Sequence, residues 1–142
     1  MNRWACIVRL GGIGDNLIAA SVLRPLKSLG YCTEVITSES AHLVFHNNPF
    51  LDKLSVIKEI PQGDAGFAWL KLRESEYDVF AHLSHSCEVR HSLLVNSTAF
   101  WHRPEYRRKL CAGSFIETVH DVVGVPYDFG PLYFPTDEEM ER

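Results

Sequence analysis

The sequence Ile-Val-Arg-Leu-Gly-Gly-Ile-Gly-Asp-Asn-Leu-Ile-Ala-Ala, residues 7–20, decides the fold. Residues 4–10 are mostly apolar and branched, which predicts a strand covered on both faces. Glycine is frequent in residues 11–14 and lets the backbone turn sharply. From Asn16 to about Leu29, apolar residues recur at helical spacing. We therefore expect a strand, a tight turn and a helix, and ligands of open α/β sheets usually bind at such a turn.

Downstream of this stretch, strand-like segments alternate with helical ones. Pro25 lies inside the first expected helix, so we expect a kink with a freed carbonyl near Ser21, and Gly30 supplies a left-handed end. The alternation predicts an α/β fold: a Rossmann-like parallel sheet with helices on both faces and strand order 3-2-1-4. Further strands are expected at residues 31–37, 55–60 and 79–83, and further helices at 38–45, up to about Ser75, and 112–123, with Gly124 ending the last.

The composition is that of one globular domain. The 142 residues are 46% hydrophobic and 23% charged. No apolar run approaches the ~20 residues that a membrane helix needs, and no signal peptide is evident, so the expected location is the cytoplasm. A net charge of -4 argues against a nucleic-acid partner. The four cysteines form no Cys-x-x-Cys pair, and His42 and His46 lack the glutamate of a metalloprotease helix, so we expect no metal site.

Asp15 is the ionised side chain of the glycine turn, and the residues alone allow more than one interpretation. It could cap the following helix, a role worth about 0.5–2 kcal/mol. A dinucleotide-binding turn is disfavoured, because Leu17 stands where the third glycine of that fingerprint belongs. The Gly-Lys-Ser/Thr of a phosphate-binding loop does not follow either.

Three segments together resemble the heptosyltransferase family of bacterial glycosyltransferases, glycosyltransferase family 9. The first is residues 7–15 with the apolar helix that follows, including its Leu26-Lys27 pair. The second is residues 48–54, an Asn-Pro-hydrophobic-Asp segment before the expected third strand. The third is the Tyr-Asp of residues 77–80, which leads into the fourth strand. Their order and spacing, rather than any one motif, carry the resemblance over about the first ninety residues.

This resemblance implies two Rossmann-like domains in the GT-B arrangement, of which the chain would be the N-terminal, acceptor-side half. The aspartate of the family's Gly-Asp pair is thought to be the general base, which places that role on Asp15. Gly11, Gly12 and Gly14 would shape the acceptor pocket. The nucleotide-sugar donor would be held chiefly by the C-terminal domain, and no cofactor is implied.

Two further segments are candidates for acceptor binding. Residues 84–91 follow the fourth expected strand, which adjoins the first strand at the switch point, so this loop could face the same crevice as Asp15. An ordinary polar loop is the alternative. Residues 102–109 concentrate four of the 14 basic residues and could bind an anionic sugar acid or a lipid phosphate, although a charge run is usually a solvated surface. The candidate acceptor-binding residues in these segments are Ser84, His85, Glu88, Arg90, Arg103 and Arg107.

The chain ends in a helix-start signal. Thr136 is followed three residues later by Glu139, which is a capping box with acids across the first turn. A helix that stopped at Arg142 would be too short to hold by itself in water. We therefore expect residues 1–135 to form the acceptor-side domain and residues 136–142 to begin a truncated interdomain helix.

The sequence thus favours the N-terminal domain of an inverting, metal-independent glycosyltransferase. It would move a sugar from an ADP-heptose-like donor to a glycan or lipopolysaccharide-type acceptor, which is compatible with peripheral association with the inner membrane. This half alone should have little or no activity, because catalysis needs both reactants held together. The alternative is a non-catalytic Rossmann-like module that binds a nucleotide or sugar phosphate at the helix start. A nicotinamide-dependent oxidoreductase is disfavoured by the missing third glycine.

Overall fold

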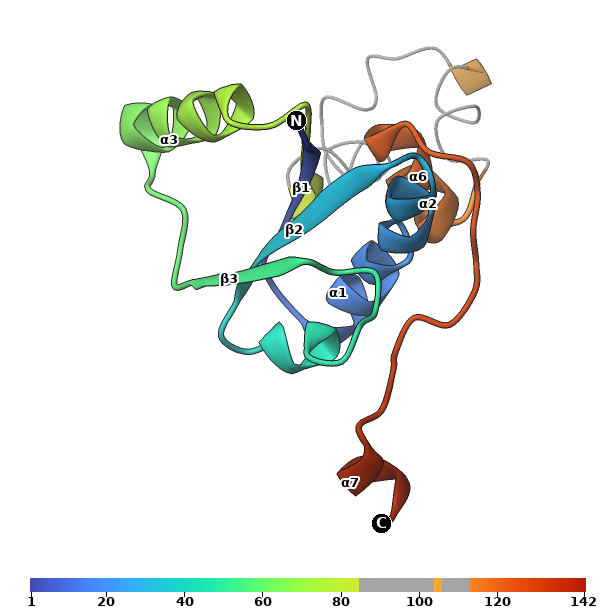
Figure 1. Ribbon diagram of the computed structural model, residues 1–142. Helices are drawn as coiled ribbons and strands as arrows, with labels where there is room; N and C mark the ends of the chain where they lie inside the picture. Colours follow the sequence, from blue (N-terminus) through green and yellow to red (C-terminus); the bar gives the residue numbers. More distant parts are fainter. Residues whose placement is uncertain (85–103, 106–112) are drawn as a thin grey trace.

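A parallel four-stranded sheet forms the centre of the molecule (Figure 1). The computed structural model describes residues 1–84, 104–105 and 113–142. The strand order is β3-β2-β1-β4, so the α/β class and the expected order are confirmed. The strands are β1 (Arg3–Arg9), β2 (Tyr31–Ser38), β3 (Lys53–Ile57) and β4 (Val79–His82).

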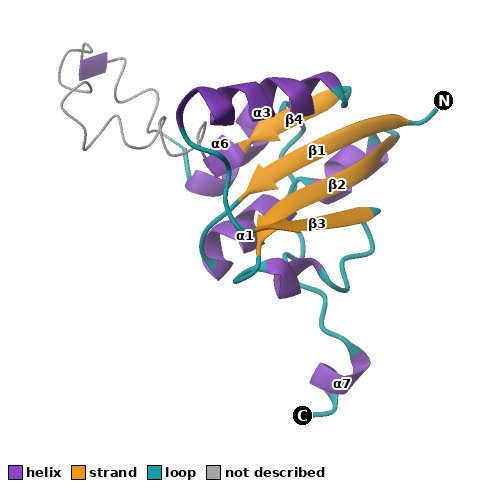
Figure 2. Ribbon diagram, turned by 90° about the vertical axis from the view of Figure 1, so that its left-hand side faces the viewer, coloured by secondary structure: helices purple, strands orange, loops and turns teal. Residues whose placement is uncertain are grey.

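Helices lie on both faces of this sheet. Figures 1 and 2 show α3 on one face and α1, α2 and α6 together on the other, whereas α7 stands apart at the end of an extended segment. Among the described residues, no helix is long and apolar enough to cross a membrane. The helices are α1 (Ile13–Ala20), α2 (Leu23–Ser28), the 3-10 helix η1 (His42–Phe45), α3 (Gly63–Ser75), α6 (Phe115–Val123) and α7 (Asp137–Met140).

Strand β1 is the buried centre of the sheet. Its residues Ala5, Cys6, Ile7 and Val8 are fully buried. Side chains alternate between faces along a strand. Accordingly, Ala5 and Ile7 belong to the larger core under α1, α2 and α6, while Cys6 and Val8 belong to a smaller core on the α3 face. The prediction of a strand covered on both faces is therefore confirmed.

The first expected helix proves to be two helices. Helix α1 begins at Ile13, three residues earlier than predicted, and α2 starts at Leu23 after a break. The break has a physical cause, because Pro25 carries no N–H to donate to the carbonyl of Ser21 four residues before it. Gly30 ends α2 with φ +88°, the left-handed conformation expected for it.

Other boundaries also differ from the sequence prediction. The helix expected at residues 38–45 is the short 3-10 helix η1 (His42–Phe45). Strand β3 was expected at residues 55–60 but spans Lys53–Ile57, and its last residue pairs with Ser38, where its partner β2 ends. Helix α6 starts after Ser114, whose side chain forms a capping box with Glu117 that the sequence analysis missed. The predicted end of α6 at Gly124 is confirmed, as is the capping box at Thr136.

Candidate functional site

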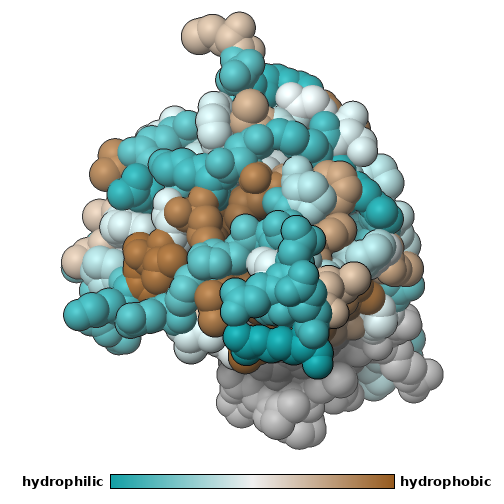
Figure 3. Space-filling view, turned by 60° about the horizontal axis from the view of Figure 1, so that its bottom comes forward, coloured by the Kyte–Doolittle hydropathy of each residue, from teal (hydrophilic) through white to brown (hydrophobic). Residues whose placement is uncertain are grey.

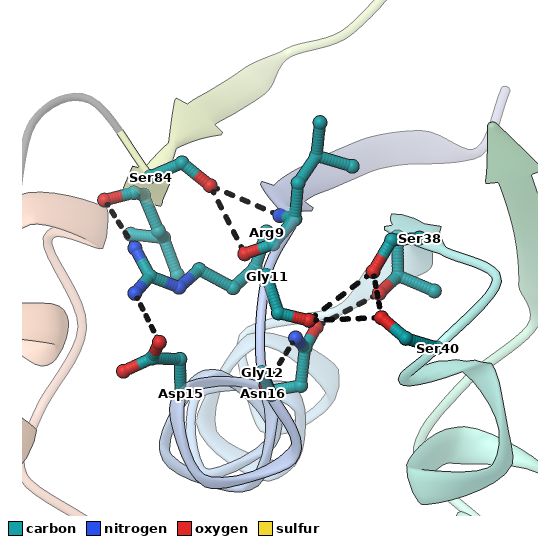
Figure 4. Close-up of polar contacts among 11 residues, drawn as sticks. Arg9, Gly11, Gly12, Asp15, Asn16, Ser38, Ser40 and Ser84 are labelled. Atoms are coloured by element: carbon teal, nitrogen blue, oxygen red, sulfur yellow. Dashed lines mark hydrogen bonds and ion pairs between the residues drawn. The ribbon is translucent and has the colours of Figure 1, made fainter. Parts of the chain in front are cut away.

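The glycine turn lies at the carboxyl edge of the sheet, between the ends of β2 and β4 (Figure 4). Gly11 has φ +104°, a conformation that L side chains rarely adopt, so glycine is required for the chain to leave β1 at this angle. The Gly11 carbonyl oxygen accepts hydrogen bonds from the hydroxyls of Ser38 (3.2 Å) and Ser40 (3.3 Å). These two bonds tie the backbone of the glycine turn to the residues at the end of β2.

Asn16 ties the start of α1 to the sheet. Its side chain is fully buried. The amide Nδ2 donates to the carbonyl of Gly12 at 2.8 Å, and Oδ1 accepts from the hydroxyl of Thr37 at 2.8 Å. Sequence analysis missed this role, although a polar residue among apolar helix positions is a usable signal, since buried amides need partners.

Asp15 lies in the first turn of α1 but does not cap it. The N-cap residue is Gly12, and no side-chain cap hydrogen bond is present, so the capping interpretation of Asp15 was wrong. The reason is that the helix starts two residues before Asp15 rather than after it. The carboxylate oxygen Oδ2 instead lies 3.0 Å from Nη2 of Arg9, and the Asp15 side chain is 45% exposed.

Arg9 is the functional candidate that sequence analysis missed. It is the last residue of β1 and is 2% exposed, which is rare for arginine. Its Nη1 donates to the carbonyl oxygen of Leu83 at 3.2 Å, and its guanidinium carbon lies 5.9 Å from the ring centre of Phe115. The sequence carries a signal for this role, because Arg9 is a charged residue in an otherwise apolar strand and a buried charge needs a partner.

Ser84 joins the end of β4 to the turn. Its Oγ accepts a hydrogen bond from the Leu10 N–H at 2.9 Å. The hydroxyl is thus engaged with the backbone of the turn, and its part in acceptor binding stays a prediction. Gly14 lies inside α1, with open space where a Cβ would stand. The other predicted acceptor-binding residues lie outside the described residues: His85, Glu88, Arg90, Arg103 and Arg107.

An apolar groove lies on the other side of α1. Figure 3 looks onto this side, where apolar residues gather around a hollow between hydrophilic surfaces. The groove has a volume of about 410 Å³. Ile13 and Leu17, which line it, are each two residues from Asp15 and so face about 200° away from it around the helix. Its lining residues are Ile13, Leu17, Leu43, Val44, Tyr133 and Glu139.

The described residues contain no cluster of three or more histidine, cysteine or carboxylate side chains that could hold a metal ion. The rings of His42 and His46 are 5.3 Å apart and nearly perpendicular. Cys6 is fully buried, and Cys32 is partly buried. The site is therefore built from one carboxylate, one guanidinium, hydroxyls and the backbone of the turn.

This arrangement has a definite chemical capacity. Within the described chain, the ion pair with Arg9 occupies Oδ2 of Asp15, and Oδ1 makes no hydrogen bond (Figure 4). A half-exposed carboxylate fixed in this way can accept a proton from a hydroxyl brought to about 2.6–3.2 Å. Comparison of the chain with protein-family models, curated proteins and solved structures finds no match.

Proposed function

We propose that this chain is the acceptor-side domain of an inverting, metal-independent glycosyltransferase with Asp15 as its general base. The observation that carries the proposal is the half-exposed Asp15 carboxylate at the carboxyl edge of the sheet, next to the switch point between β1 and β4. The resemblance of residues 7–15, 48–54 and 77–80 to heptosyltransferases supplies the substrate class. The donor is then an ADP-heptose-like nucleotide sugar, and the acceptor is a bacterial glycan or lipopolysaccharide-type hydroxyl.

The reaction proceeds by direct displacement at the anomeric carbon. The acceptor oxygen forms a bond to that carbon on the face opposite the nucleotide, and the bond from the carbon to the phosphate oxygen breaks. ADP departs with the electron pair of the broken bond. The proton of the acceptor hydroxyl passes to Asp15, so the base must lie within hydrogen-bond reach of that hydroxyl. Inversion follows from the single displacement.

The position of Asp15 also favours the enzyme over a nucleotide-binding module. A phosphate bound at a helix start is stabilised by free N–H groups and by the positive end of the helix dipole. In α1 the first turn already carries the Asp15 carboxylate. A phosphate placed there would meet a like charge. Binding of ADP or inorganic phosphate by this chain, measured by titration calorimetry at micromolar affinity, would support the module instead.

The proposal places the protein in the cytoplasm, with peripheral contact to the inner membrane where a lipid-linked acceptor lies. The test uses the natural protein expressed from its complete reading frame, ADP-heptose as donor and heptose-deficient lipopolysaccharide as acceptor. We expect acceptor-dependent release of ADP and a gain of one heptose in the acceptor mass, with inverted anomeric configuration by NMR. No ADP release and no mass gain would overturn the proposal.

A further inference from the structure

We propose that Arg9 is the positioning residue of this site: it holds Oδ2 of Asp15 so that Oδ1 faces the acceptor hydroxyl. The inference rests on the proposed function and adds a second residue to it. Arg9 does not touch the reacting atoms in this account. It acts through the carboxylate that it orients.

The burial and contacts of Arg9 hold its side chain in a fixed orientation. The residue is 2% exposed and is anchored at the end of the central strand β1. One arm of its planar guanidinium donates to the carbonyl of Leu83 directly after β4, and the other lies 3.0 Å from Asp15 Oδ2. Because the guanidinium is a rigid fork, the two contacts constrain each other. The carboxylate is therefore positioned by the sheet as well as by its own helix (Figure 4).

Asp15 has little else to orient it. Its side chain makes no cap hydrogen bond, and the ion pair with Arg9 is the polar contact that the described chain gives to its carboxylate. A side chain without such contacts distributes over several staggered rotamers. Catalysis is sensitive to this freedom, since a displacement of about 1 Å can cost about 100-fold in rate.

A second Gly-Asp pair in the chain provides an internal comparison. Gly63-Asp64 also stands in the first turn of a helix, α3. Asp64 is exposed, and within the described residues it has no ion-pair partner. A Gly-Asp helix start therefore does not by itself require a buried arginine. The buried arginine accompanies the Gly-Asp pair that follows the central strand β1 through the glycine turn.

The test measures transfer by the natural full-length protein with ADP-heptose and heptose-deficient lipopolysaccharide. The variants are Arg9→Met, which keeps an apolar stem, and Arg9→Lys, which keeps the charge but not the fork. Lys27→Met is the matched control, because Lys27 is a partly exposed cation paired with a different carboxylate, Asp52. Circular dichroism and a melting curve establish the folded fraction, and rates are measured well below the melting temperature.

We expect Arg9→Met to lower kcat about 10- to 100-fold while KM for both substrates stays within about two-fold, with Arg9→Lys intermediate and Lys27→Met unchanged. A purely structural role would instead lower activity in proportion to the folded fraction. If Arg9→Met does not fold, Arg9→Lys decides: a wild-type kcat overturns the proposal, and a lowered kcat at unchanged KM supports it. Wild-type protein without transfer overturns the proposed function and this assignment with it, whereas active wild type with unaffected Arg9 variants overturns this assignment alone.

Discussion

Removing the Tyr77 hydroxyl should destabilise the protein far more than removing a similar hydroxyl at the surface. Tyr77 donates a hydrogen bond of 2.6 Å to Oε2 of Glu34, a carboxylate that is 4% exposed on the α3 face of the sheet. The other oxygen of Glu34 accepts from Ser55 at 2.8 Å and lies 3.3 Å from Lys53 Nζ. Deleting one donor leaves a buried charge partly unsatisfied.

The electrostatics of this cluster support the assignment of the donor. Burial, and then the hydrogen bond to Glu34, raises the pKa of Tyr77 above its ordinary value, so the phenol keeps its proton at neutral pH. Burial, and then the charge of Glu34, raises the pKa of the neighbouring Cys6 thiol to about 12. Both neighbours of the carboxylate are therefore neutral, and Tyr77 acts as a hydrogen-bond donor.

The magnitude follows from the loss of one hydrogen bond to a buried charged group, which costs about 1.5–3 kcal/mol. For a chain of this size, Tyr77→Phe should lower the melting temperature by about 5–10 °C. Urea unfolding followed by circular dichroism gives the free energy of unfolding directly. The phenylalanine ring keeps the stacking contact with Phe80, so the change isolates the hydroxyl.

Tyr133→Phe is the matched control. Tyr133 makes a hydrogen bond of the same length, 2.6 Å, to Glu139, but both side chains are exposed. We expect a change below about 0.5 kcal/mol there. Equal losses in the two variants, or a Tyr77→Phe protein as stable as the wild type, would refute the claim that the buried Glu34 network stabilises the fold.

Two further predictions concern the turn and the acid limit of stability. Gly11→Ala should destabilise the protein by about 1–2 kcal/mol, because Gly11 has φ +104°. Gly14→Ala should stabilise it by about 0.5–1 kcal/mol in the same urea assay, because Gly14 lies inside α1 with open space where a Cβ would stand. Losses of stability of equal size in the two variants would contradict the turn geometry. The hydrogen bond from Lys27 holds the pKa of Asp52 below its usual range, so its contribution to stability is present above about pH 4 and is lost as the pH falls through the lowered pKa. In the Asp52→Asn variant, the free energy of unfolding should therefore fall less steeply as the pH is lowered. The variant should lose less than about 1 kcal/mol at neutral pH, since a third of the Asp52 side chain is exposed. The same fall in stability with pH as in the wild type would contradict this.

The fold was predictable because its signals are local and repeated. The apolar run of β1, the glycine turn and the capping box at Thr136 each specify backbone geometry directly, and parallel strands joined by helices leave few topologies. Boundaries were less accurate where tertiary contacts decide them. Strand β3 ends where its partner β2 ends, which no property of residues 55–60 shows.

The site was only partly predictable for a related reason. Asp15 was found because of its place in the glycine turn, but its contact depends on Arg9, six residues away on the preceding strand. Glu34 is a charged residue within β2 and is nevertheless buried, because the side chains of Tyr77 and Ser55 reach it from distant positions in the sequence. Such partners follow from the folded arrangement and not from spacing along the chain.

The most direct test of the central claim compares Asp15→Asn with Asp64→Asn in the natural full-length protein. Both residues follow a glycine in the first turn of a helix, but Asp15 follows the central strand β1 through the glycine turn and pairs with Arg9, whereas Asp64 has no ion-pair partner among the described residues. The account predicts that Asp15→Asn lowers kcat/KM for heptose transfer at least about 100-fold with folding intact, while Asp64→Asn stays within about two-fold of the wild type. Equal transfer by the two variants would contradict it.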